Sequence, residues 1–201
     1  MANPSARTKL LDAAINVIRA QGYAATSVDD LCQAAGVTKG AFFHHFASKD
    51  EMAVAAANHW TTTTVPLFET APYHQPTDPA SRVLGYVAFR KAILTGPTIP
   101  DFSCLAGTLV QETYDSHPAI RDACGASIVG HAETLIPDIQ AALDEAGRSA
   151  MSAHSLALFT QSTLQGAFVL AKATNDPGVA ADCCDHLTRY LELIFARPPE
   201  A

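Results

Sequence analysis

Apolar residues recur every three to four positions along most of the chain, and no stretch alternates apolar and polar residues for long enough to predict a strand. The first apolar stripe runs from Leu11 to Ile18. Its helix is expected to begin after Ser5, a suitable N-cap, and to end near Gly22. The pattern as a whole predicts an all-α fold.

Two short helices joined by a glycine turn are predicted next, over residues 27–35 and 38–46. Ser27 with Asp30 forms a capping box in which Asp stands in for the usual Glu or Gln. Gly36 is expected to stop the first helix, because glycine takes a positive φ without a Cβ penalty. Such a pair is the arrangement of a helix-turn-helix. The apolar residues expected to lock it are Val28, Leu31, Ala35, Val37 and Phe42.

A fourth helix is predicted from the capping box of residues 48–51, and Pro66 is expected to end it. Pro137 is expected to kink or divide one later helix. Asp176 followed by Pro177 predicts the start of the last helix. The later helices are predicted at about 80–95, 104–116, 118–147, 152–173 and 178–196.

Composition and charge limit the partners of the chain. It has 201 residues, of which 48% are hydrophobic and 16% charged, and no window approaches 18 uninterrupted apolar residues. The polar N-terminus lacks the apolar core of a signal peptide, so we expect a soluble cytoplasmic protein with no membrane partner. The net charge is −7, with a balance of +1 over residues 1–50 and −8 over residues 51–201. A nucleic-acid contact is therefore expected only in the first fifty residues.

Cysteine and histidine positions predict neither a metal site nor a cofactor. The five cysteines are odd in number and follow no metal-ligand spacing, which favours reduced thiols in a cytosolic protein. His44 and His45 are adjacent and point in different directions on a helix, and the other histidines lack ligand partners at helical spacing.

Three segments near the N-terminus resemble a known family. They read TSVDDL from Thr26, AAGVTKGAFFHHF from Ala34 and SKDE from Ser48. In order and spacing they are similar to the signature of the TetR/AcrR family of transcriptional repressors, over about residues 5–55. The resemblance implies a homodimer with a DNA-binding domain at residues 1–50 and a ligand-binding and dimerisation domain at 51–201. It also implies no enzymatic activity and release from a near-palindromic double-stranded operator when a small molecule binds.

The resemblance also implies which residues contact DNA. Those at positions where the family reads base edges or the adjacent backbone are Thr38, Lys39, Gly40 and His44. Those at positions where it holds phosphates are Thr26, Ser27, Phe43 and Lys49. Phe43 departs from the tyrosine that the family often has, which removes a hydroxyl bond to phosphate. A contact with a thymine methyl or a sugar is the alternative.

Apolar stripes on the last two helices are candidates for a dimer interface, and the alternative is an intramolecular core that periodicity cannot distinguish. The resemblance favours an isologous four-helix interface. The stripe residues are Leu156, Phe159, Thr163, Ala167, Leu170, Leu187, Tyr190, Leu191 and Ile194.

A small-molecule effector is expected to bind among side chains of the middle of the chain, although each of these is also a candidate for ordinary core. The candidate residues are Trp60, Phe89, Phe102, Cys104 and Phe168. Few cations lie in this region, which favours an apolar or weakly polar effector.

Cys104 has a second interpretation. Its surroundings resemble a branch of the family with electrophile-sensing repressors, although Ser103 replaces the usual glycine there. The rival functions are an all-α enzyme that uses Cys104 or a histidine, and a helical interaction module.

Overall fold

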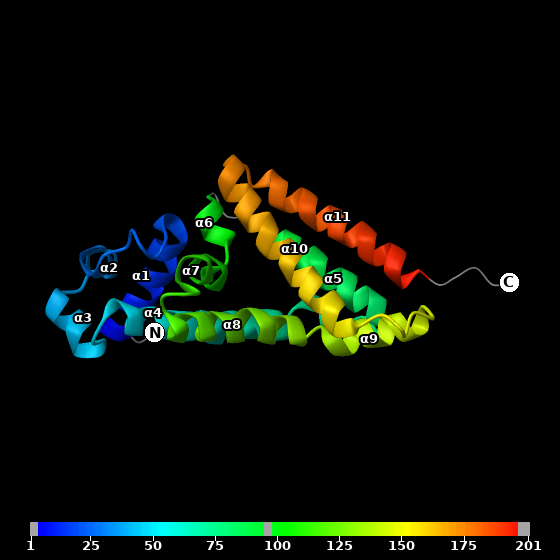
Figure 1. Cartoon of the computed structure of the whole chain (residues 1–201), viewed down its shortest axis with the longest axis horizontal. Coiled ribbons are helices and arrows are strands. Elements are labelled where there is room, and N and C mark those ends of the chain that lie inside the picture. Colours follow the sequence, from blue (N-terminus) through cyan, green and yellow to red (C-terminus); the bar gives the residue numbers. More distant parts are fainter. Residues whose placement is uncertain (1–3, 95–97, 197–201) are drawn as a thin grey trace. The chain divides into compact units, whose positions relative to one another are not determined.

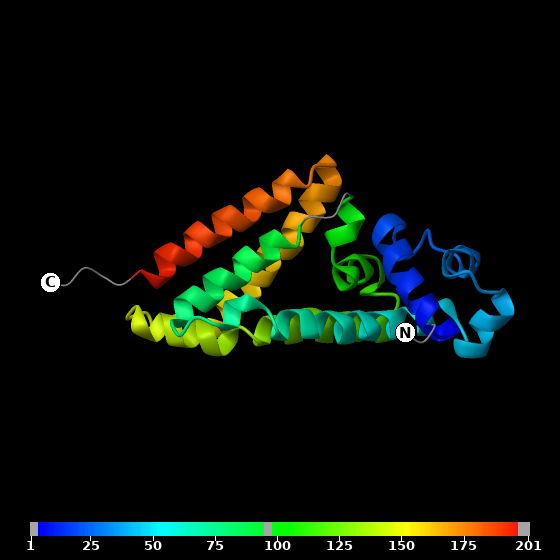
Figure 2. The same ribbon diagram turned by 180° about the vertical axis from the view of Figure 1, so that it is seen from behind.

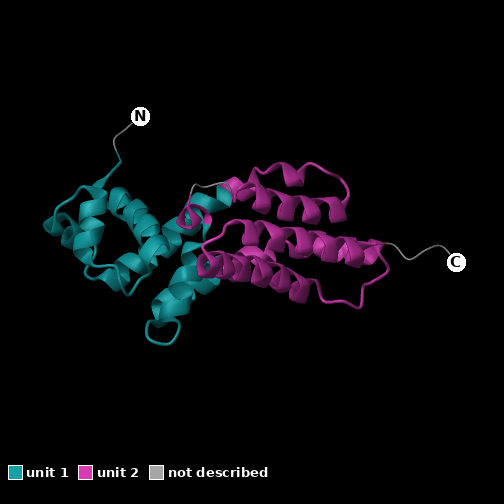
Figure 3. Cartoon of the chain, turned by 90° about the horizontal axis from the view of Figure 1, so that it is seen from above, with its two compact units in different colours: residues 1–66, 103–128 teal, residues 67–102, 129–201 magenta. Residues whose placement is uncertain are grey.

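The structure, a computed structural model, describes residues 4–94 and 98–196 and divides into two compact units (Figure 3). The first unit comprises residues 1–66 and 103–128, and the second comprises residues 67–102 and 129–201. The described residues form helices, turns and bends without any strand, so the predicted all-α class is confirmed. Over these same residues no helix is both long and apolar enough to cross a bilayer.

The first unit begins with the four predicted helices (Figure 1). Pro66 does not end the fourth helix, which continues to Glu69. Proline removes one backbone donor, but its φ is compatible with a helix, so one further turn forms. Two of the boundaries between the units fall within α4 and α8, and the third follows the end of α6 at Phe102. The helices are α1 (Ala6–Gln21), α2 (Val28–Ala35), α3 (Lys39–His45), α4 (Lys49–Glu69), α7 (Leu105–Thr113) and α8 (Pro118–Glu133).

The second unit contains the remaining helices, of which α10 and α11 lie side by side and α5 lies against α11 (Figures 1 and 2). The helix predicted over 118–147 is divided, as Pro137 indicated, and Pro137 lies in the first turn of α9. Asp176 Oδ1 accepts the N–H of Gly178 (2.8 Å), and α11 begins at Gly178. The elements are η1 (Pro72–His74), α5 (Pro79–Ala92), α6 (Ile99–Phe102), α9 (Ile136–Glu145), α10 (Ala153–Thr174) and α11 (Gly178–Phe195).

Each unit has its own apolar core, which supplies most of the driving force for its folding. In the first unit, buried side chains of α1, α2, α3, α4, α7 and α8 join one cluster, which fixes the helix-turn-helix to the rest of the unit. Its largest members include Leu10, Ile18, Leu31, Phe42, Phe46, Met52, Leu105 and Leu109. The second core includes Tyr86, Val87, Ile139, Leu143, Leu156, Leu187 and Leu191.

Candidate nucleic-acid interface

The turn between α2 and α3 has the local geometry that the sequence predicted. Ser27 Oγ accepts the N–H of Asp30 (3.1 Å), and Asp30 Oδ2 accepts the N–H of Ser27 (2.8 Å), which completes the capping box. Gly36 lies in the left-handed region with φ 63° and ψ 38°. Thr38 Oγ1 accepts the N–H of Ala41 (3.2 Å) and so caps α3. These bonds fix where α3 starts and in which direction it leaves the turn.

The N-terminal half of α3 presents polar and small residues to solvent. Phe42 is fully buried and anchors the helix, whereas Phe43 is 52% exposed. Lys39 Nζ lies 3.0 Å from Asp29 Oδ1 in α2, so this cation has a partner in the free protein. The exposed predicted contact residues are Thr38, Lys39, Gly40, Phe43 and His44.

Thr26 and Lys49, predicted to hold phosphates, bond to the protein itself in this structure. Thr26 is 1% exposed, and its hydroxyl donates to the carbonyl of Gly22 (2.6 Å). Lys49 Nζ donates to the carbonyls of Tyr23 (3.0 Å) and Thr26 (2.9 Å) and lies 4.1 Å from the centroid of the Tyr23 ring. Both side chains hold the connection between α1 and α2, while Ser27 at the start of α2 is exposed.

Carboxylates from distant parts of the chain also hold this connection. Glu112 of α7 accepts the backbone N–H groups of Tyr23 (2.9 Å) and Ala24 (2.8 Å). The Tyr23 hydroxyl donates to Asp50. The pKa of Tyr23 is raised, mainly by burial and to a smaller extent by this hydrogen bond. His117 Nε2 lies 3.7 Å from Asp50 Oδ2. Sequence patterns carry no signal for these contacts, because the partners are far apart along the chain.

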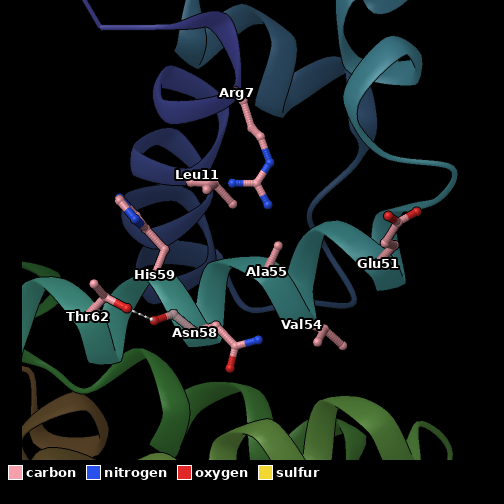
Figure 4. Close-up of a pocket in the computed structure, with 8 residues that line it drawn as sticks. All are labelled: Arg7, Leu11, Glu51, Val54, Ala55, Asn58, His59 and Thr62. Atoms are coloured by element: carbon pink, nitrogen blue, oxygen red, sulfur yellow. Dashed lines mark hydrogen bonds between the residues drawn. The ribbon is translucent and has the colours of Figure 1, made fainter.

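An open hollow of about 370 Å³ lies between α1 and α4 in the first unit (Figure 4). Arg7 and Leu11 of α1 face residues of α4 across it, and the Thr62 hydroxyl donates to the carbonyl of Asn58 (3.0 Å). None of the predicted effector residues lines this hollow. Its lining consists of Arg7, Leu11, Glu51, Val54, Ala55, Asn58, His59 and Thr62.

The predicted effector residues fall in both units. Trp60 and Cys104 belong to the first unit, where the Arg19 guanidinium lies 5.2 Å from the Trp60 ring. Cys104 Sγ accepts the N–H of Gly107 (3.4 Å) and caps α7.

The other three predicted effector residues lie in the second unit. The rings of Phe102 and Phe168 are 6.2 Å apart, and Phe89 contacts Phe68 edge-on at 5.7 Å. The structure therefore brings Phe102 and Phe168 together, while Phe89 belongs to a neighbouring aromatic group.

The predicted dimer stripe divides into buried, half-buried and exposed residues. Leu156, Leu187 and Leu191 lie in the core of the second unit, and Ala167 is buried against α6. These four residues therefore belong to the intramolecular core of one chain, which is the alternative that periodicity left open. Thr163 and Ile194 are half-buried. The exposed members are Phe159, Leu170 and Tyr190.

The exposed members form part of an apolar face on α10 and α11. The rings of Phe159 and Tyr190 lie 5.1 Å apart across the two helices. Leu193, which the sequence pattern did not single out, is a further exposed apolar side chain of α11, at 70% exposure.

Most of the curated proteins with similar sequences match this chain over only 20–24% of its length. HTH-type transcriptional repressor KstR2 of Rhodococcus jostii is 46% identical over 46 residues, which are 23% of this chain and 22% of that protein. The chain thus spans less than a quarter of the length of the first curated relatives it matches. Transcriptional regulator AcuR of Cereibacter sphaeroides is 28% identical over 131 residues, 64% of this chain and 57% of that protein.

Family models and a solved structure extend the similarity to the whole fold. A crystal structure of a TetR transcriptional regulator from Chloroflexus aurantiacus has a TM-score of 0.79 at 23% identity, covering 92% of this chain and 93% of that one. The family model for bacterial regulatory proteins of the tetR family matches residues 10–56. The model for the C-terminal domain of LmrA/YxaF-like transcriptional regulators matches residues 94–182. The chain therefore belongs to the TetR family of transcriptional regulators.

Proposed function

We propose that the protein is a dimeric transcriptional repressor, without enzymatic activity, that binds a near-palindromic double-stranded operator and is released by a small, mainly apolar effector. The observation that carries the proposal is the turn at Gly36, which presents an exposed, capped α3 braced by the buried Phe42. A recognition helix needs this combination, because it must enter a major groove while the rest of its unit stays folded. Such a regulator would act in the cytoplasm, with residues 1–50 contacting DNA and 51–201 binding the effector and the second subunit.

Contacts with bases would come from the start of α3. Thr38, Lys39 and His44 offer hydrogen-bonding groups, and Gly40 allows a close approach of the backbone. Phe43 lacks a hydroxyl but is exposed, which supports an apolar contact with a thymine methyl or a sugar. Ser27 and the N–H groups at the start of α2 are suited to a phosphate, since a helix N-terminus attracts anions.

The exposed apolar face of α10 and α11 supports a homodimer. Phe159, Leu170, Tyr190 and Leu193 leave apolar surface that a second copy would cover. Two antiparallel copies of a helix pair make a self-complementary four-helix interface. A dimer would present two recognition helices to two half-sites, which explains the expected near-palindrome.

A gel-shift assay with the DNA upstream of the protein's own coding sequence tests the proposal. We expect sequence-selective binding that Lys39→Ala abolishes. Arg148→Ala is the matched control, because Arg148 is an exposed cation in the second unit. Binding that does not discriminate between sequences, or that is equally strong in Lys39→Ala, would contradict DNA recognition by α3 and favour an enzyme or an interaction module.

Release by an electrophile acting on Cys104 is a second candidate for the effector response. The observation in its favour is that Cys104 is only half-buried and that its Sγ lies at the N-terminus of α7, where it accepts the N–H of Gly107. Cys124 is less suited to this role, because burial raises the pKa of its thiol to about 12. In this case Cys104→Ser keeps DNA binding but loses release by N-ethylmaleimide, while Cys183→Ser behaves like the unaltered protein. Unchanged release from Cys104→Ser would rule it out.

A further inference from the structure

Arg90 of α5 is a buried cation that no carboxylate neutralises among the described residues. Its side chain is only 9% exposed, and neither an ion pair nor a hydrogen bond joins its guanidinium to another described residue. The two other cations of the same helix differ from it, since Arg82 pairs with Asp138 (2.6 Å) and Lys91 pairs with Asp185 (2.5 Å). A buried charge without a counterion is unfavourable for folding, so its retention calls for an explanation.

Aromatic rings flank the guanidinium of Arg90. Its central carbon lies 5.4 Å from the centroid of the Phe68 ring and 5.7 Å from that of Phe168. These contacts attract the cation to the ring faces. They supply no hydrogen-bond acceptor, so the planar fork of N–H donors remains available for an anion.

A chain of polar side chains lies beside this group. Tyr86 lies one helical turn before Arg90 in α5. Its hydroxyl accepts a hydrogen bond from Gln161 Nε2 (2.7 Å) and lies 3.0 Å from His131 Nε2. The His131 ring packs against Phe68 with centroids 4.3 Å apart. The pKa of His131 is lowered to about 4, mainly by burial and to a smaller extent by the positive charge of Arg90. The imidazole is therefore neutral near pH 7. Within this group the one positive charge is therefore that of Arg90.

We propose that Arg90 binds the carboxylate of the effector, and that the effector is a small monocarboxylic acid whose apolar body packs against Phe68 and Phe168. This inference rests on the proposed function, because it names the chemical class of the molecule that releases the DNA. It also refines the expectation of an apolar or weakly polar effector, since a single acid group is added to an apolar body.

The charge balance favours a monoanion over a phosphate. One guanidinium neutralises one carboxylate and can hold both of its oxygens in a bidentate pair. A phosphate monoester carries nearly two charges near pH 7. With His131 neutral, the second charge would stay uncompensated in surroundings from which water is largely excluded.

Binding to the full-length protein without DNA tests the proposal by calorimetry and thermal shift. The probes are aliphatic and aromatic monocarboxylates from propionate to hexanoate and benzoate, each paired with its primary amide, together with phenyl phosphate. We expect at least one acid to bind about tenfold more tightly than its amide. Arg90→Met should bind acid and amide alike, whereas Lys91→Met, the neighbouring cation with its own carboxylate partner, should keep the preference.

Arg90→Lys provides a second variant that keeps the charge but loses the bidentate fork. It should weaken acid binding about tenfold and leave amide binding unchanged, which decides the matter if Arg90→Met does not fold. The proposal is overturned if no acid is preferred over its amide, if phenyl phosphate binds best, or if the folded Arg90 variants keep the full preference. Arg90 is then held by its rings for structural reasons alone.

Operator binding by the same preparations separates the two proposals. Selective DNA binding without any acid preference leaves the repressor function standing and removes the carboxylate site. An Arg90-dependent preference for acids without selective DNA binding leaves the site standing and removes the repressor function.

Discussion

Glu112 of α7 and Tyr23, which follows α1, are joined by a hydrogen bond from the Tyr23 backbone N–H to the Glu112 carboxylate (2.9 Å). The second carboxylate oxygen accepts the N–H of Ala24 (2.8 Å). Tyr23 and Ala24 lie immediately before the helix-turn-helix. A residue of α7 thus fixes the connection that leads into α2. A movement of α7 within the first unit would therefore also displace that connection.

Replacing this carboxylate should loosen the connection. We expect Glu112→Ala to lower the free energy of unfolding by about 1–2 kcal/mol, because two N–H groups lose a charged acceptor. It should also weaken operator binding, although Glu112 is not a predicted DNA contact. Urea unfolding and gel-shift titration measure both effects. Gln111→Ala on the same helix is the control, and equal behaviour of the two variants would argue against the role of Glu112.

Two glycines at helix ends should respond differently to alanine. A Cβ on Gly22 (φ +86°) would lie 2.6 Å from Glu112 Oε1, whereas a Cβ on Gly36 (φ +63°) meets nothing within 4 Å. Gly36→Ala should therefore cost about 1 kcal/mol for its backbone alone, and Gly22→Ala should cost more.

Urea unfolding of both single variants and of Gly22→Ala with Glu112→Ala separates the backbone cost from the contact. We expect the double variant to lose less stability than the sum of the single changes, because the clashing carboxylate is gone. Simple additivity would show that the contact with Glu112 contributes little to the cost at Gly22.

A hydroxyl added to the exposed Phe43 should strengthen DNA binding. Phe43→Tyr places a donor where the family often has tyrosine, and the phosphate bond it forms is worth about 1 kcal/mol per half-site. Fluorescence anisotropy with operator DNA measures the change in Kd. Phe43→Leu, which has no hydroxyl, should not tighten binding. A Kd that stays unchanged or rises in Phe43→Tyr would indicate that this side chain does not face a phosphate.

Salt should weaken operator binding in proportion to the phosphates that the protein neutralises. With about four to eight phosphates neutralised by a dimer, the plot of log affinity against log salt concentration has a slope of about −4 to −7. Anisotropy titrations from low to moderate salt give this slope. Because Lys49 donates to carbonyls of its own unit, we expect Lys49→Gln to change stability more than the slope. A flat salt response would contradict anchoring by phosphates.

His131 should make the second unit sensitive to acid. Burial lowers its pKa from 6.5 to about 4, so between these values the unfolded chain binds more protons than the folded one. The contribution of His131 therefore makes the free energy of unfolding rise with pH between about 4 and 6.5, by up to about 3 kcal/mol, and level off above that window. Thermal unfolding from pH 4 to 7 should show a smaller slope in His131→Gln. His154→Gln, at an exposed position, should match the unaltered protein.

Features that depend only on residues close together in the chain could be predicted from the amino-acid sequence. The Ser27–Asp30 capping box, the positive φ of Gly36 and the cap at Thr38 each involve groups within three residues of one another, so local chemistry decides them. Pro66 shows the limit of such rules, since a proline weakens a helix without always ending it.

The amino-acid sequence by itself determined most of the helices and the helix-turn-helix with its caps, because periodicity and capping are properties of short segments. Only the tertiary structure decided which face of each helix meets another element. It turned Leu156 and Leu191 into the core and left Tyr190 outside, and it brought Glu112 to Tyr23 from 89 residues away. It also buried Arg90 between two rings. A one-dimensional pattern records that a helix has an apolar side, but the partner of that side is selected by packing in three dimensions.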